Sequence, residues 1–195
     1  MVTQPAVRIR TIAVDHGPER SRRLVRRRSG WLLRRLAGRR QPPRVCGDLY
    51  WPVDLAVAAA MIELPFRAAR SARVALARDA VTGRLGVVDV ALREREETSA
   101  APGELVAAVA AADDEAWLEF ARDQVVRRYR PSGLVGLELC ERERVYVPYH
   151  VVAEGDSTFL VDRLMHRVEP ARSLRGEAEE TVASGGGGAH APPER

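Results

Sequence analysis

The chain has 195 residues, with 31 basic side chains against 27 acidic ones and a formal net charge of +4. This length is enough for one domain with tails, and a core of that size needs no metal or disulfide. Two cysteines, Cys46 and Cys140, are too few for a disulfide framework and lack the spacing of a zinc site. We expect both thiols to be buried and inert.

Hydropathy gives no sign of a membrane-spanning or secreted chain. No apolar run approaches the roughly 20 residues that a spanning helix needs. The start of the sequence, MVTQPAVRIR, lacks the apolar region and cleavage site of a secretory signal. The sequence therefore predicts a cytoplasmic protein.

Charge is divided sharply along the chain. The first 45 residues hold 13 arginines and two acidic residues, whereas the remaining 150 hold 18 arginines and 25 acidic residues. The two parts carry about +11 and −7, which is typical of a basic segment that meets a polyanion, attached to an acidic globular body. Lysine is absent from both parts, which fits the codon usage of a GC-rich bacterial genome better than selection for guanidinium groups.

The basic part, residues 1–45, is expected to be a strand–helix arm. Residues 7–14 combine β-branched side chains with arginines at alternate positions, which predicts a strand. Residues 19–40 then predict a helix that ends before Pro42 and packs through a narrow apolar stripe.

The body is expected to span residues 46–170. The stretch after Pro52 is ambiguous between a strand and a helix, and its alanine content favours a helix. Residues 72–92 predict a hairpin whose turn contains Gly83. Next comes a helical segment at 104–130, either one helix or two helices divided at Asp113-Asp114, where either Asp could cap the second. Strands are predicted at 134–140, 145–152 and 158–162. Residues 171–195 form an acidic, Gly-rich tail that we expect to be largely disordered.

Together these elements predict an α+β fold. A mainly antiparallel sheet carries one long helix packed on it, and the basic N-terminal helix is added to this body. The residues expected in the core are Leu76, Val87, Val88, Leu118, Val125, Leu137, Val147, Val151 and Leu160.

Two short segments resemble each other. Tyr50-x-Pro52 and Tyr146-x-Pro148 are both followed by an Asp, four residues and an Arg, at 79–84 and 162–167. A true repeat would build the sheet from two similar β-hairpin units, with the basic helix as an insertion in the first. Matches this short also arise by chance, and Asp is a common turn residue, so both interpretations stay open.

The sequence contains no pattern that identifies a reaction. It has no glycine-rich phosphate loop and no GxSxG, and the carboxylates at 113–115 are best explained as helix capping. His150 and His166 could approach each other, with Cys140 as a third ligand, but ordinary structural histidines are favoured over a metal site. We expect no catalytic residue, no metal and no cofactor.

The arginine-rich segment is thus the candidate site. Its arginines are suited to phosphate contacts, which give affinity without sequence specificity. They are Arg20, Arg22, Arg23, Arg26, Arg27, Arg28, Arg34, Arg35, Arg39 and Arg40. The sequence predicts a non-enzymatic binding or accessory protein, with nucleic acid as the first candidate partner. An acidic protein surface, including the chain's own body, is the second, and peripheral association with a membrane is the third.

Overall fold

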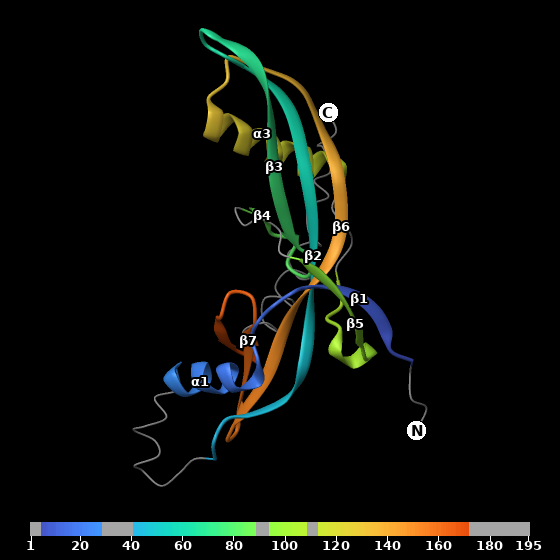
Figure 1. Cartoon of the computed structure of the whole chain (residues 1–195), viewed down its shortest axis with the longest axis vertical. Coiled ribbons are helices and arrows are strands. Elements are labelled where there is room, and N and C mark those ends of the chain that lie inside the picture. The colour runs from blue at the N-terminus through green and yellow to red at the C-terminus, as the bar shows by residue number, and fades with distance from the viewer. Residues whose placement is uncertain (1–4, 29–40, 89–93, 109–112, 172–195) are drawn as a thin grey trace, which may run out of the picture.

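An eight-stranded mixed β-sheet dominates the computed structural model, which describes residues 5–28, 41–88, 94–108 and 113–171 (Figure 1). The elements in chain order are β1 (Val7–Ile12), α1 (Pro18–Arg28), β2 (Arg44–Leu64), β3 (Arg67–Asp79), β4 (Leu85–Val87), β5 (Arg95–Ala100), a 3₁₀ turn (Pro102–Glu104), α3 (Asp114–Tyr129), β6 (Gly133–Glu154), β7 (Ser157–Asp162) and β8 (Val168–Pro170). The chain is therefore an α+β, sheet-dominated protein.

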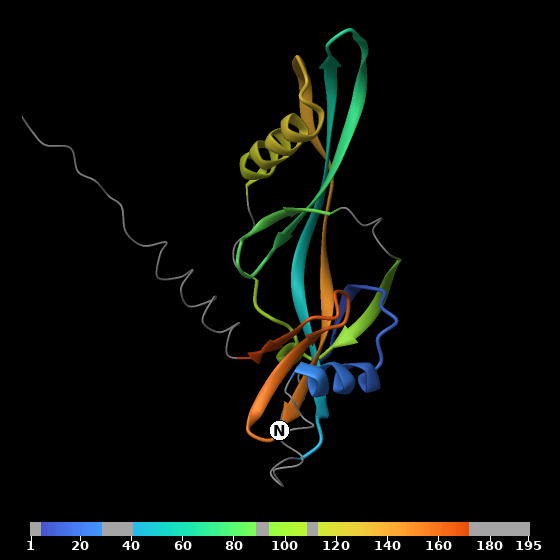
Figure 2. The same ribbon diagram turned by 90° about the vertical axis from the view of Figure 1, so that its left-hand side faces the viewer.

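The sheet is built on one long antiparallel ribbon. β2 pairs with β6 from Arg44 opposite Ala153 to Glu63 opposite Gly133. At about 3.3 Å per residue, strands of 21 and 22 residues span roughly 70 Å. β1 and β5 pair antiparallel and cross the ribbon near its middle, where Thr11 bridges Tyr146 in the parallel sense (Figures 1 and 2).

The upper half of the ribbon, as oriented in Figure 1, carries β3, β4 and the helix α3. The buried residues here are Ala56, Ala58, Ile62, Ala72, Val74, Leu76, Trp117, Ala121 and Val125. Small side chains on β2 leave room for Trp117 beneath the helix. The Asp113 carboxylate caps α3 by accepting a hydrogen bond from the backbone N–H of Ala116 at 2.9 Å.

The lower half carries β7, β8 and the helix α1. β7 pairs with the last residues of β6, and β8 pairs with β7. Val25 of α1 packs on Val152, Val161 and Val168, which come from three different strands. Each end of the ribbon is thus covered by its own helix.

The stretch after Pro52 is a strand, and the helix expected there is wrong. Both sides of β2 are hydrogen-bonded, to β3 and to β6, so the ladder outweighs the helical preference of alanine. The expected strands at 134–140 and 145–152 are a single strand, β6, whose pairing with β2 continues through irregularities. The helix expected at 104–130 is confined to α3.

The expected core is only partly correct. Leu76, Val125, Val147 and Leu160 are buried. Val87 is exposed because β4 is a three-residue strand at the edge of the sheet. The other four expected core residues, Val88, Leu118, Leu137 and Val151, are half-buried. Both cysteines are exposed, which contradicts the expectation of buried thiols.

The two Tyr-x-Pro segments lie opposite each other in the ribbon. Tyr50 faces Pro148 and Pro52 faces Tyr146, with Trp51 opposite Val147 at the centre. The carbonyls of the two prolines each accept one hydrogen bond at 3.1 Å, from the backbone N–H of Ala80 and of Arg163 respectively.

The two Asp–Arg segments form similar turns. One carboxylate oxygen of Asp79 accepts from two backbone N–H groups, those of Val81 and Thr82, and one of Asp162 accepts from those of Leu164 and Met165. The residue four places after each Asp, Gly83 or His166, has a left-handed backbone, with φ of 76° and 58°.

The predicted arm meets the body at several places. β1 pairs with β5 along its length, and α1 contacts β2, β6, β7 and β8. The rest of the predicted basic helix, 29–40, and the predicted tail after residue 171 lie outside the described residues. Among the described residues, no helix is long and apolar enough to cross a membrane.

Replacing Trp117 tests the upper core. We expect Trp117→Ala to lower the free energy of unfolding by about 3–5 kcal/mol, because it empties the space under α3. The matched variant Trp117→Phe should cost less than about 1.5 kcal/mol, since it also removes an indole N–H that has no hydrogen-bond partner among the described residues. Urea unfolding measures both, and equal losses would contradict this description of the core.

Candidate polyanion-binding helix and its anchor

The sequence of α1 favours a short, strongly basic helix. Pro18 opens it, where its missing N–H costs nothing, and the carbonyl of Gly17 accepts from the N–H of Arg20 at 3.1 Å. The acidic residue Glu19 lies in the first turn and three arginines lie in the last, which complements the helix dipole. With six arginines and one glutamate, α1 has a formal charge of +5.

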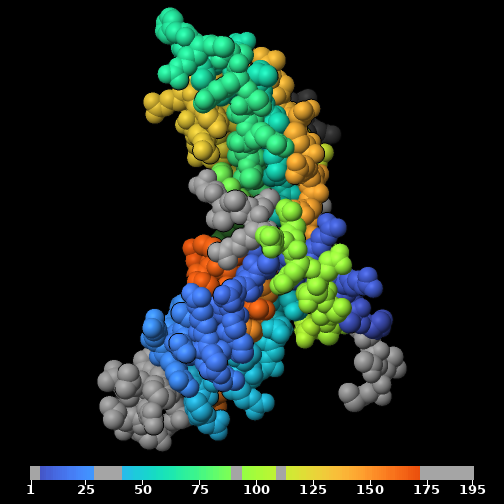
Figure 3. Space-filling model, in the orientation of Figure 1, coloured from blue at the N-terminus to red at the C-terminus, as the bar shows by residue number. Residues whose placement is uncertain are grey.

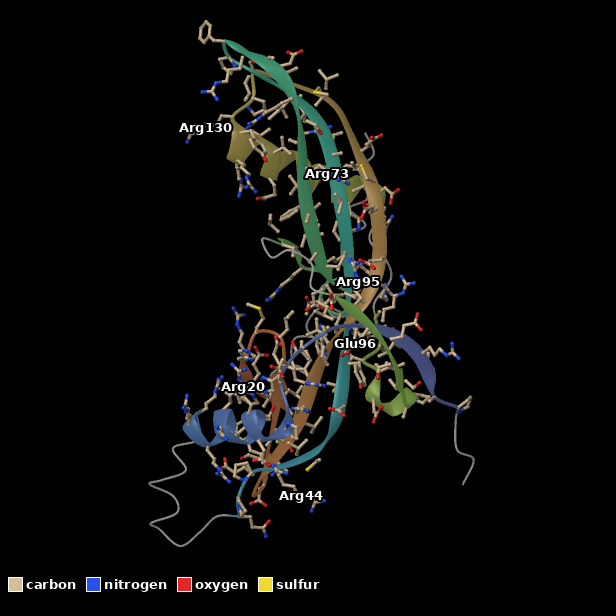
Figure 4. The ribbon with its side chains drawn as sticks, viewed as in Figure 1. Arg20, Arg44, Arg73, Arg95, Glu96 and Arg130 are labelled. Carbon is tan, nitrogen blue, oxygen red and sulfur yellow. The ribbon has the colours of Figure 1, made fainter. Side chains whose placement is uncertain are left out.

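One side of α1 is buried and the other carries the arginines. Ser21 and Val25, one turn apart, are the buried residues of the helix. Arg20, Arg23 and Arg27 follow each other at spacings of three and four, so they form one row on the exposed side. Figure 3 shows α1 covering the front of the lower half, and Figure 4 labels Arg20 on this helix.

The six described arginines of the predicted site do not play one role. Arg20, Arg23, Arg26 and Arg27 are exposed. Arg22 is half-buried and pairs with Glu19 at 2.6 Å. Arg28 donates to the backbone carbonyl of Val168, so it helps to fasten the helix to β8. The remaining four predicted arginines, Arg34, Arg35, Arg39 and Arg40, lie outside the described residues.

A chain of polar contacts anchors the buried side of α1. The Ser21 hydroxyl lies 2.7 Å from Nδ1 of His150 and 2.8 Å from Nε2 of His16. Nδ1 of His16 lies 2.8 Å from Nδ1 of His166. At the other end, Nε2 of His150 lies 3.5 Å from a carboxylate oxygen of Asp48. Five side chains from distant parts of the sequence therefore meet under the helix.

The Asp48 carboxylate at one end of the anchor favours one direction of hydrogen-bond donation along the chain of side chains. If His150 donates from Nε2 towards the Asp48 carboxylate, its Nδ1 is left to accept from Ser21. The Ser21 oxygen then accepts from Nε2 of His16, and Nδ1 of His16 accepts from Nδ1 of His166. Each of the three hydrogen bonds among Ser21 and the histidines then has one donor and one acceptor, with a single proton on each imidazole. The reverse direction would place a nitrogen lone pair of His150 against the carboxylate.

The environment of the anchor favours the neutral form of His16 and of His150. The pKa of His16 is lowered from 6.5 to about 4, mainly by burial, with smaller contributions from the neighbouring His166 and His150 and from cationic arginines. Burial and the charge of Arg163 also lower the pKa of His150, against the opposing effect of Asp48. A second proton on His16 would also place two N–H groups against each other in the chain.

The anchor corrects the interpretation of the histidines. His16 stands between His150 and His166, with its ring centre 6.0 Å from that of His150 and 4.8 Å from that of His166, and Cys140 is elsewhere on β6. No group of three or more His, Cys, Asp or Glu side chains in the described part of the chain is arranged to hold a metal ion.

Sequence reasoning missed Ser21, His16 and Asp48. The one available signal was a serine among arginines at the position where the narrow helical stripe should be apolar. Ser21 precedes Val25 by one turn, so a helical projection places its hydroxyl on the buried face. Its partners could not be found this way, because they lie up to 129 residues away in the sequence.

A cavity of about 460 Å³ beside the middle of the ribbon is a weaker candidate site. Its wall includes Arg10, Arg95, Cys140 and Glu143. Arg95 forms an ion pair with Glu143, so part of its charge is neutralised within the protein. The exposed arginine row of α1 is the denser cationic feature.

Comparison with known proteins assigns no function. No family model matches the chain, and no curated protein and no solved structure matches it either. The residues and geometry of α1 and its anchor are therefore the basis for proposing a function.

Removing the hydroxyl of Ser21 tests the anchor. We expect Ser21→Ala to lower the free energy of unfolding by about 1–3 kcal/mol, because one donor and one acceptor in the buried histidines lose their partner. The control Ser71→Ala, on an exposed strand position, should change it by less than about 0.5 kcal/mol. Thermal or urea unfolding checks both, and an unaffected Ser21→Ala protein would show that the anchor contributes nothing.

The lowered histidine pKa values also predict a pH dependence. Because the folded pKa of His16 lies below its unfolded value of 6.5, the unfolded chain binds more protons between about pH 6.5 and 4. Stability should be fully present above pH 6.5 and fall as the pH is lowered through this window. We expect His16 to account for about 1–2 kcal/mol of the loss between pH 7 and 5.

The measurement is the free energy of unfolding across this range for the wild type and for His16→Gln. The difference in slope isolates the histidine from carboxylates that titrate in both proteins. A wild-type slope no steeper than that of the variant would contradict the lowered pKa.

Proposed function

We propose that this protein is a non-enzymatic binding or accessory protein that contacts a polyanion through its arginine-rich segment, and that the polyanion is nucleic acid. The observation that carries the proposal is the exposed row of Arg20, Arg23 and Arg27 on a helix whose opposite side is anchored. The ion pairs of the described part of the chain, such as Arg22 with Glu19, do not involve these three side chains.

The row has the properties that phosphate binding requires. Guanidinium groups donate in pairs to phosphate oxygens and stay charged at any physiological pH. The spacing of Arg20, Arg23 and Arg27 along α1 presents them to a linear polyanion, and anchoring the helix reduces the conformational entropy lost on binding. Contacts of this kind give affinity without reading sequence.

We also propose that the sheet is built from two repeated units, α1 to β4 and α3 to β8. The support comes from the paired Tyr-x-Pro segments, their matching proline hydrogen bonds and the matching Asp turns. In this alignment α1 corresponds to α3. The basic helix is then the first unit's equivalent of α3 and not the insertion in the first unit that the sequence suggested. Ser21 and Trp117 each precede the Tyr of their unit by 29 residues, and both are buried.

The two units differ in the chemistry under their helices. Where Trp117 fills an apolar core, Ser21 enters the polar anchor. The pair Asp48 and His150 corresponds to the pair Arg144 and Asp54, in which the guanidinium donates twice to the carboxylate at 2.6 and 3.1 Å. This difference supports the first unit's helix as the one adapted for binding.

A salt titration of binding tests the proposed function. We expect affinity for duplex DNA to fall linearly on a log–log plot against salt, because bound phosphates release counterions. Replacing Arg20, Arg23 and Arg27 together by Ser should reduce the magnitude of that slope by about 2–3, at about 0.9 per lost phosphate contact. Single-stranded DNA and RNA are titrated in parallel to identify the preferred nucleic acid.

The control removes the same charge elsewhere, with Arg8, Arg84 and Arg122 replaced by Ser, all of which are exposed. It should leave the slope within about 1 of the wild type. If the intact chain ignores all three nucleic acids at low salt, the proposal is wrong. Capture of an acidic protein by α1, lost in the triple variant, would then favour the accessory-protein function.

A further inference from the structure

The turn between β2 and β3 forms the upper tip of the molecule as oriented in Figure 1, and it carries a solvent-exposed aromatic ring. Pro65 and Phe66 are the two central residues of this turn, and the Phe66 side chain is fully exposed. Figures 1 and 2 both show this turn protruding beyond the rest of the fold, at the end opposite to α1. An aromatic side chain at such a place buries nothing within its own chain.

Phe66 also adopts a backbone conformation that disfavours it. Its φ is 60°, in the left-handed region, where a bulky side chain is an outlier. A proline followed by a left-handed residue is typical of a type II turn, whose second position is normally Gly or Asn. The turn between β6 and β7 meets the same need for positive φ with Gly155, at 58°. Local folding therefore gives no reason for a phenylalanine at position 66.

The surroundings of Phe66 are mainly basic, with Glu63 at the end of β2 as an exposed acidic neighbour. Arg67 and Arg70 follow on β3, and Arg128 and Arg130 lie at the end of α3, and all four are exposed. The guanidinium groups of Arg70 and Arg128 lie 5.1 and 5.6 Å from the ring centre of Tyr129. Figure 4 shows Arg130 at the end of α3, on the side of the turn. An anionic surface is the complementary partner.

Further apolar side chains lie close behind the turn. Met61 and Val135 face each other across β2 and β6 and are 44% and 55% exposed. They lie about 10 Å behind the end of the strand, so they are the next apolar side chains to reach an interface that Phe66 has entered. Burying aliphatic side chains at the acyl boundary is energetically favourable, whereas these side chains have no ring that could stack on nucleic-acid bases. In addition, a convex tip fits a planar surface better than it fits a groove. These points favour lipid over nucleic acid.

We propose that the β2–β3 turn is a membrane-contact tip that inserts Phe66 into the interface of an anionic bilayer, with Arg67, Arg70 and Arg130 on the headgroups. This inference concerns a different surface from α1 and does not depend on nucleic-acid binding. Phe66 supplies apolar burial, and each arginine near an anionic surface adds about fivefold in affinity. Binding should be reversible and weaken with salt.

The test uses the full chain and vesicles of phosphatidylcholine with phosphatidylglycerol in equal parts, and of phosphatidylcholine alone. In the variant F66W we expect the added indole emission, taken as the difference from wild type, to shift to shorter wavelength with the anionic vesicles. In co-sedimentation, the affinity of F66N for these vesicles should be lower than that of the wild type by a factor of at least about ten, because the variant loses the burial of one aromatic ring. The melting temperature of F66N should be unchanged or raised, since Asn tolerates positive φ.

The matched control is M165S, which removes another exposed apolar side chain from a turn in the lower half. It should bind vesicles like the wild type, and so should the triple variant of the α1 row. Wild-type binding by F66N overturns the proposal. Quenching of F66W emission by DNA, with no emission shift on vesicles, would also overturn it, since the tip would then contact nucleic acid. A wild-type dimer that dissociates in F66N would overturn it too, since the tip would then contact a second copy of this chain.

Discussion

The pairing of β2 with β6 is the constraint on which the rest of the structure depends. This one antiparallel ribbon runs through the whole sheet, and both of its strands continue past the centre, so each contributes to both halves of the molecule. β3 pairs with the second half of β2, from Val53 to Leu64, and β7 pairs with the last residues of β6. The two helices are therefore held apart at opposite ends, and the chemistry of each end can change without disturbing the other.

At the lower end, the contact between helix and sheet is polar where the upper one is apolar. A buried hydroxyl between two imidazoles is worth keeping only if every donor and acceptor is satisfied, because an incomplete network costs more than an apolar core. The anchor meets this condition with neutral histidines, in surroundings that already contain Arg20 and Arg163. Neutrality matters here because a charged imidazole beneath a helix of formal charge +5 would be repelled.

The sequence predicted what depends on local pattern and missed what depends on distant partners. Charge segregation located α1, and turn chemistry located Gly83 and the Asp113 cap. A helix was wrongly predicted after Pro52 because alanine favours helices, whereas hydrogen bonding to β3 and β6 on both sides holds β2 extended. The anchor was beyond reach for a similar reason: Ser21, Asp48 and His150 become neighbours only when β2 and β6 pair.

The central claim is that a neutral, fully hydrogen-bonded chain of histidines and a serine holds the arginine helix to the sheet. Nitrogen-15 NMR of the imidazole rings at pH 7 tests it most directly, because it reports the protonation of each ring nitrogen. We expect His16 and His150 to carry their proton on Nε2 and His166 to carry it on Nδ1. An imidazolium at His16, or a proton on Nδ1 of His150, would contradict it.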